Sequence, residues 1–192
     1  VKAFGNLARV FRVGSDTKAG ERELHVPFWA LTADEFIALS MGSISGIPLT
    51  LLQKWLLSSK QASKPGGVEH GFSDLTVTVD TPLPFSVFKL WLDLYSLHCA
   101  NHFVSENQNQ TEMTRAYIEE GTPPQKAIGD AGRLVRPKFA PVNQEAGTKK
   151  VFKGLHSNLP RTHLDILESK LRDPRMRFLF DPGNWAVTED GT

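Results

Sequence analysis

A chain of 192 residues with 40% hydrophobic residues is long enough to form one domain with a buried core. Its formal net charge of +1 does not require a polyanionic partner, although a neutral total can conceal a basic segment. The single cysteine, Cys99, excludes an intrachain disulfide and favours a reducing compartment, so we expect a cytoplasmic protein.

Two further features of the sequence bear on its context. It contains neither an apolar run long enough to cross a bilayer nor a basic-then-apolar leader, so no membrane partner is expected. It begins with Val1 rather than methionine, which leads us to expect that residues 1–192 form a single domain or a fragment of a larger protein.

The N-terminal part predicts two short strands followed by a capped helix. Leu7 to Val13 and Leu24 to Phe28 are rich in branched and aromatic residues and could pair as a hairpin. Thr32 has the chemistry of an N-cap, and Glu35 follows three residues later, which is the pattern of a capping box. Gly42 can adopt the left-handed conformation that ends a helix.

The sequence also predicts which residues of this first helix are packed against others. Leu31, just before the cap, can pack against Phe36 as a hydrophobic staple. Its predicted apolar stripe consists of Phe36, Ile37, Leu39 and Met41.

The remaining patterns complete a mainly α fold. Apolar periodicity and caps predict further helices over Ile47–Ser59, Phe85–Phe103, Glu112–Glu120 and Leu159–Arg172. Alternation predicts two more short strands, over Leu75–Val79 and Met176–Phe180. We therefore expect a bundle of four to five helices with a small β element.

The segment from Thr122 to Ser157 shows no persistent period and is predicted as a long basic loop. Seven basic residues face two carboxylates there, a net charge of +5. The segment is either a solvated loop or a contact for the phosphates of double-stranded DNA. The candidate DNA-contact residues are Lys126, Arg133, Arg136, Lys138, Lys149, Lys150 and Lys153.

The sequence carries no recognisable catalytic or cofactor site. No GxxxxGK[ST] motif is present, and the glycine clusters Lys64–Gly67 and Gly129–Gly132 lack the required lysine and hydroxyl spacing. His98 and His102 have the i, i+4 spacing that binds a metal on a helix, with Cys99 beside them, but the glutamate of an HExxH motif is missing. A metal-dependent hydrolase is an alternative that these residues favour only weakly, and no metal ligand is assigned.

Four segments of the sequence stand out together: VFRVG at Val10–Gly14, HVPFWALTADEFIAL at His25–Leu39, VTVDTPLPFSVFKLW at Val77–Trp91 and LRDPRMRFLFDPGNW at Leu171–Trp185. In this order they resemble the HerA-type ATPases of the HerA/FtsK superfamily, which are ring-forming, ATP-driven DNA translocases of prokaryotes. The resemblance spans nearly the whole chain, from Val10 to Trp185.

The resemblance implies that this chain is part of a motor protein. The matching region of that family is a largely helical insertion between the Walker A and Walker B strands of a RecA-like domain. It implies a parent helicase or translocase that uses ATP and Mg, forms a ring oligomer and can pair with a nuclease or other effector in DNA repair or antiphage defence. It transfers no catalytic residue to this chain, so we expect the fragment to be inactive alone and to contact neighbouring subunits or a partner protein.

Overall fold

The computed structural model describes residues 11–13, 22–63, 73–103, 114–142, 145–146, 149–153 and 159–180. Its helices are α1 Ala33–Met41, α2 Ile47–Gln61, α3 Val87–Cys99, α4 Arg161–Arg172 and α5 Arg177–Phe180, with 3-10 turns η3 Phe28–Ala30 and η5 Pro174–Met176. Its strands are β1 Phe11–Arg12, β2 Arg22–Glu23, β3 Asn101–Phe103, β4 Thr114–Arg115, β5 Glu119–Glu120, β6 Gln125–Lys126, β7 Glu145–Ala146 and β8 Lys149–Lys153. The prediction of a mainly α fold with a small β element is confirmed.

The α1 helix begins and ends as its sequence predicts. The Thr32 backbone N–H donates to Glu35 Oε2 at 3.0 Å, and Glu35 N–H donates to Thr32 Oγ1 at 3.3 Å, which completes the capping box. Gly42, with a φ of +86°, follows the last turn. Leu39 is 41% exposed, so its assignment to the buried stripe is wrong.

Helices α2 and α4 closely match their predicted ranges, whereas α3 is shorter than predicted. Its N-cap Ser86 accepts a hydrogen bond from Lys89 N–H at 3.1 Å, and the helix ends at Cys99. The next residues leave the helix because they pair with β8 as β3.

The predicted helix over Glu112–Glu120 is wrong for its described part, residues 114–120. Thr114–Arg115 pairs with β3 as β4, and Glu119–Glu120 pairs with β6. Ala116 N–H donates to Asn101 O at 2.8 Å. Partners distant in sequence therefore satisfy the backbone groups that a helix would pair locally.

The predicted strand over Leu75–Val79 is also wrong, because this stretch forms turns with local hydrogen bonds. Thr78 N–H donates to Thr81 Oγ1 at 2.8 Å, and Leu75 is 98% exposed. Threonine hydroxyls that bond nearby backbone groups compete with extended pairing.

The other predicted strands differ from the structure as well. Met176–Phe180 is helical, since the Asp173 side chain accepts from Arg175 N–H at 2.9 Å and starts η5, which runs into α5. The predicted strand Leu24–Phe28 is wrong, because residues 24–27 form no regular element and Phe28 begins η3. The expected hairpin is replaced by a parallel two-residue pair of β1 with β2, which lies before the predicted strand, and residues 7–10 lie outside the described residues.

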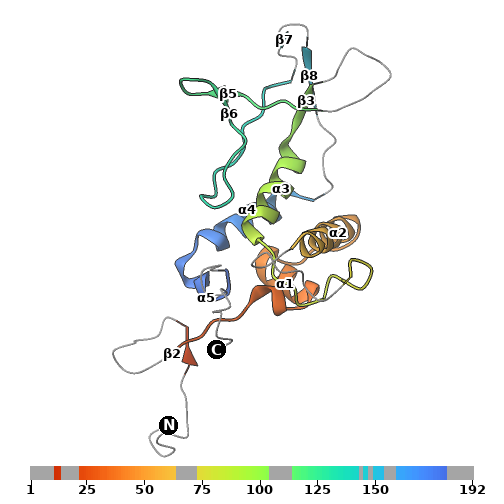
Figure 1. Cartoon of the computed structure of the whole chain (residues 1–192), viewed down its shortest axis with the longest axis vertical. Helices are drawn as coiled ribbons and strands as arrows, with labels where there is room; N and C mark the ends of the chain where they lie inside the picture. The colour runs from red at the N-terminus through yellow and green to blue at the C-terminus, as the bar shows by residue number, and fades with distance from the viewer. Residues whose placement is uncertain are drawn as a thin grey trace, which may run out of the picture.

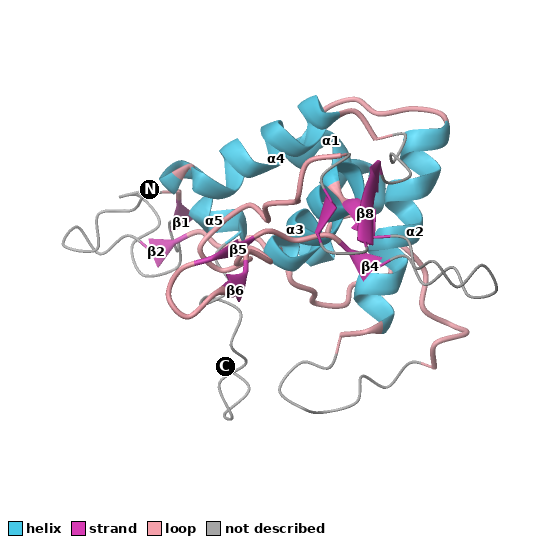
Figure 2. Cartoon of the chain, turned by 90° about the horizontal axis from the view of Figure 1, so that it is seen from above, coloured by secondary structure: helices cyan, strands magenta, loops and turns pink. Residues whose placement is uncertain are grey.

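The predicted long loop from Thr122 to Ser157 contains strands. Its first part closes the β5–β6 hairpin, and its later part contributes β7 and β8 to an antiparallel sheet of order β4-β3-β8-β7. Figure 1 shows these strands beyond the C-terminal end of α3, and Figure 2 shows the chain from above.

Two hydrophobic cores follow from this arrangement. The main core lies among the helices and contains the ring contacts of Phe28 with Phe85 at 5.1 Å and with Phe180 at 5.9 Å. The small core under the sheet contains Ala116, Ala140 and Val151. None of the helices in the described ranges combines the length and apolarity needed to cross a bilayer.

Replacing Phe28 with alanine tests the main core. Phe28 is 3% exposed, so we expect Phe28→Ala to lower the free energy of unfolding by about 3–5 kcal/mol in urea denaturation. The control Leu75→Ala, at a position that is 98% exposed, should change it by less than about 0.5 kcal/mol. Equal effects of the two substitutions would contradict the central position of Phe28.

Candidate functional site

Arg136, one of the seven candidate DNA-contact residues, is held by α3 and α4. Its Nη2 lies 2.8 Å from Asp165 Oδ1, and its Nε donates to Glu168 Oε2 at 2.8 Å. Its guanidinium carbon lies 5.0 Å from the ring centroid of Tyr95. The hydrogen bond to Glu168 is the main reason why the pKa of Arg136 is raised. Its cationic group is therefore already engaged within the protein.

Two more of the candidates are paired with carboxylates at the surface. Lys138 Nζ lies 2.7 Å from Glu120 Oε1, and Arg133 Nε lies 3.8 Å from Asp130 Oδ2. Exposed pairs of this kind add little to stability. They nevertheless reduce the positive charge that the segment offers to a phosphate.

The remaining candidates lie on two different hairpins. Lys126 is exposed on β6, whereas Lys150 and Lys153 are exposed on β8. No carboxylate is paired with these three lysines among the residues that the structure describes. The side chain of Lys149 lies outside the described part. The seven residues thus come from several elements rather than from one loop.

The histidine pair considered as a metal site is split between two elements. His98 lies on α3, but His102 lies on β3, so the two do not share the i, i+4 face of a helix. Burial, and secondly Arg115, lower the pKa of His102. Within the described ranges, no group of three or more His, Cys, Asp or Glu side chains is arranged to hold a metal ion.

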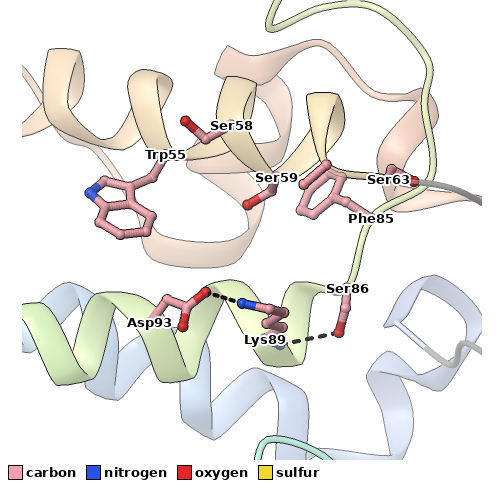
Figure 3. Close-up of a pocket in the computed structure, with 9 residues that line it drawn as sticks. Trp55, Ser58, Ser59, Ser63, Phe85, Ser86, Lys89 and Asp93 are labelled. Atoms are coloured by element: carbon pink, nitrogen blue, oxygen red, sulfur yellow. Dashed lines mark hydrogen bonds and ion pairs between the residues drawn. The ribbon is translucent and has the colours of Figure 1, made fainter.

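A hollow of about 390 Å³ lies between α2 and the start of α3, and the sequence did not predict it. Figure 3 shows Trp55 and Phe85 on its apolar walls and several serines from both sides. Lys89 Nζ and Asp93 Oδ2, 2.6 Å apart, form an ion pair at its edge. A concave apolar surface with a few polar groups can bind a side chain of another protein segment.

A second hollow of about 470 Å³ lies where the turn after β6 meets the C-terminal helices. Phe88, Leu171 and Met176 contribute apolar surface, and Arg133 and Arg177 contribute positive charge. The apolar periodicity of the sequence predicts that such residues lie in the core. It does not predict where the packed elements leave a hollow between them.

Arg136 can be tested as a structural rather than a ligand-binding residue. We expect Arg136→Met to lower the free energy of unfolding by about 1–3 kcal/mol, because the buried Glu168 loses a charged partner. Arg133→Met is the matched control, and its change should stay below about 0.5 kcal/mol, since the Arg133 side chain is 85% exposed. Chemical denaturation of both variants checks this, and an Arg136 variant as stable as the control would refute it.

No protein-family model matches this sequence, and no curated protein matches it. The resemblance to HerA-type ATPases accordingly depends on the four segments of the sequence alone.

Proposed function

We propose that this chain is the helical accessory lobe of a HerA-like, ATP-driven DNA translocase. One observation carries the proposal: three of the four resembling segments meet in one aromatic cluster. Phe28, Phe85 and Phe180 come from different segments, and Phe28 contacts both of the other rings. Val26 N–H also donates to Phe178 O at 2.9 Å. The segments thus act together as packing motifs of one lobe.

The first segment and the end of the fourth contribute less to this argument. Of Val10–Gly14, the structure describes residues 11–13, and β1 in this stretch pairs with β2. Residues after Phe180 lie outside the described part. The support therefore comes from the contacts of η3, α1, α5 and Phe85, which lies just before α3.

In this proposal the lobe does not bind the nucleotide. A RecA-like motor binds ATP and Mg through its Walker motifs, and the sequence of this chain has no phosphate-binding motif. The lobe would be an insertion in that motor domain, acting in the cytoplasm in DNA repair or antiphage defence. The role of the lobe is to contact a neighbouring subunit of the ring, or a nuclease or other effector protein.

The geometry favours protein docking over the alternative of duplex DNA contact through residues 122–157. Arg136 and Lys138 are already paired with carboxylates at 2.8 and 2.7 Å, which weakens a continuous phosphate-binding surface. The hollow between α2 and α3 instead offers a concave apolar surface. Lys126, Lys150 and Lys153 are the exposed lysines on which the duplex-contact alternative depends.

The activity of the full-length protein tests the proposal directly. We expect it to hydrolyse ATP with Mg, and to do so faster when duplex DNA is added, because translocation couples the two. The 192-residue chain alone should release no phosphate in the same assay. Hydrolysis by the isolated chain, or a full-length protein without ATPase activity, would overturn the assignment.

The docking role of the hollow can be tested with one substitution at its edge. Ser58 lines the hollow and is exposed, so Ser58→Arg should obstruct it without disturbing the core. We expect the dissociation constant of the full-length ring to rise at least about tenfold, because the partner must either bury the new charge or move away from the hollow.

Thr50→Arg adds the same side chain at an exposed position of α2 that does not line the hollow, and it should leave the assembly intact. Mass photometry over a dilution series measures both variants. An unchanged ring in the Ser58 variant would exclude the hollow as the subunit contact.

A further inference from the structure

The two faces of the four-stranded sheet differ in chemistry. One face packs over the small core of Ala116, Ala140 and Val151. Successive side chains of a strand point to opposite faces, so neighbours of these residues in the strands lie on the other face. The register places His102 opposite both Arg115 and Phe152. These three side chains therefore share the face away from the small core, which we call the outer face.

Aromatic rings extend the outer face beyond the strands. Arg115 Nη1 donates to the Tyr117 hydroxyl at 3.4 Å, which places Tyr117 on the same side. Tyr117 in turn stacks on Phe139, with ring centroids 4.9 Å apart and ring planes at 28°. Phe152 is 48% exposed, so part of its ring is open to a ligand. Rings and a guanidinium thus alternate across neighbouring strands.

Two cationic side chains, Arg115 and Lys150, lie on the outer face. Lys150 lies two residues before Phe152 on the same strand and is exposed, so it points to the same side. Neither Arg115 nor Lys150 forms an ion pair with a carboxylate among the described residues, although Glu145 lies opposite Lys150 in the register. His102 Nδ1 is buried and has no hydrogen-bond partner in the described part of the chain.

We propose that the outer face binds single-stranded DNA, with bases stacked on Phe152 and phosphates held by Arg115 and Lys150. Every base has a flat π face, so stacking on an exposed ring is favourable and tolerant of sequence. In a duplex these faces are already covered by neighbouring base pairs, so Phe152 selects an unpaired strand. Figure 1 shows the sheet beyond the C-terminal end of α3, and both Lys150 and Phe152 are exposed.

This inference goes beyond the proposed function and does not depend on it. Translocation along a duplex requires no single-strand site, and the outer face lies on a different part of the fold from the hollow between α2 and α3. Measurements of ring assembly or of ATPase activity therefore do not test single-strand binding. Measurements of single-strand binding likewise do not test the accessory-lobe proposal.

Fluorescence anisotropy with labelled oligothymidine tests the proposal on the whole chain. We expect Phe152→Ala to weaken binding by about 5- to 100-fold, because one base loses its stacking partner. Phe152→Tyr keeps a ring and should retain near-normal affinity. Ile128→Ala, at an exposed apolar position outside the sheet, is the matched control and should have no effect. Circular dichroism confirms that each variant is folded.

Salt dependence and strand type complete the test. Arg115→Gln should weaken binding and reduce the slope of log affinity on log salt by about 1, as expected when one phosphate loses its cation. A duplex of the same length should bind more weakly than the single strand. Duplex binding as tight as single-strand binding, tighter binding of the matching RNA, or a Phe152→Ala variant that binds normally would each overturn the proposal.

Discussion

The helical part of the structure depends on the ring contacts of Phe28. This residue of η3 lies 6.0 Å from Phe36, 5.1 Å from Phe85 and 5.9 Å from Phe180, measured between ring centroids. Each such pair contributes about 0.5–1.5 kcal/mol beyond the burial of its apolar area. Phe28 thereby joins α1, the segment just before α3, and α5, and the first and last of these are separated by more than half of the chain.

A second constraint joins the strands to the helices, and it lies in the turn between Gly129 and Arg136. A Cβ at Gly129, whose φ is +80°, would lie 2.6 Å from Val135 O, so the turn requires glycine. Leu134 enters the main core with 7% exposure, and Arg136 bridges to α4. The basic character of this stretch is thus partly structural. Its best-paired cation keeps the β part of the chain attached to the helices.

The helices were largely predictable from the sequence because their signals are local. The cap of α1 needs only Thr32 and Glu35, which are three residues apart, and Pro48 marks the first turn of α2. The short strands were not predictable, since pairs such as His102 with Arg115 are formed by residues from different parts of the sequence. Apolar and polar residues alternate in Leu75–Val79 as they do in a strand. In the described part of the chain this segment pairs with no strand and forms turns instead.

The same limit applies to the candidate sites. The seven basic residues were correctly counted, but Arg136 is neutralised by carboxylates 29 and 32 positions away, and no local pattern indicates this. The outer face of the sheet was missed for a related reason. Phe152 and Arg115 become neighbours of His102 only when the strands pair, and the prediction of a loop and a helix separated them. The hollow between α2 and α3 likewise arises from packing rather than from periodicity.

The buried Lys60 of α2 fixes the turns that precede α3. It is 2% exposed, and its Nζ donates to Val79 O at 2.6 Å and to Thr81 O at 2.8 Å, which fixes the turns before α3 against α2. Burial lowers the pKa of Lys60. The ring of Phe85 lies 5.9 Å from this ammonium, lines the hollow and also contacts Phe28.

One side chain therefore belongs to both the hollow and the aromatic cluster. A partner seated between α2 and α3 would press on Phe85, and through it on the rings that hold the resembling segments together. Conversely, any loosening of the cluster would reshape the wall that a partner meets. In the accessory-lobe proposal, the docking surface therefore includes a ring of the main core as well as surface residues.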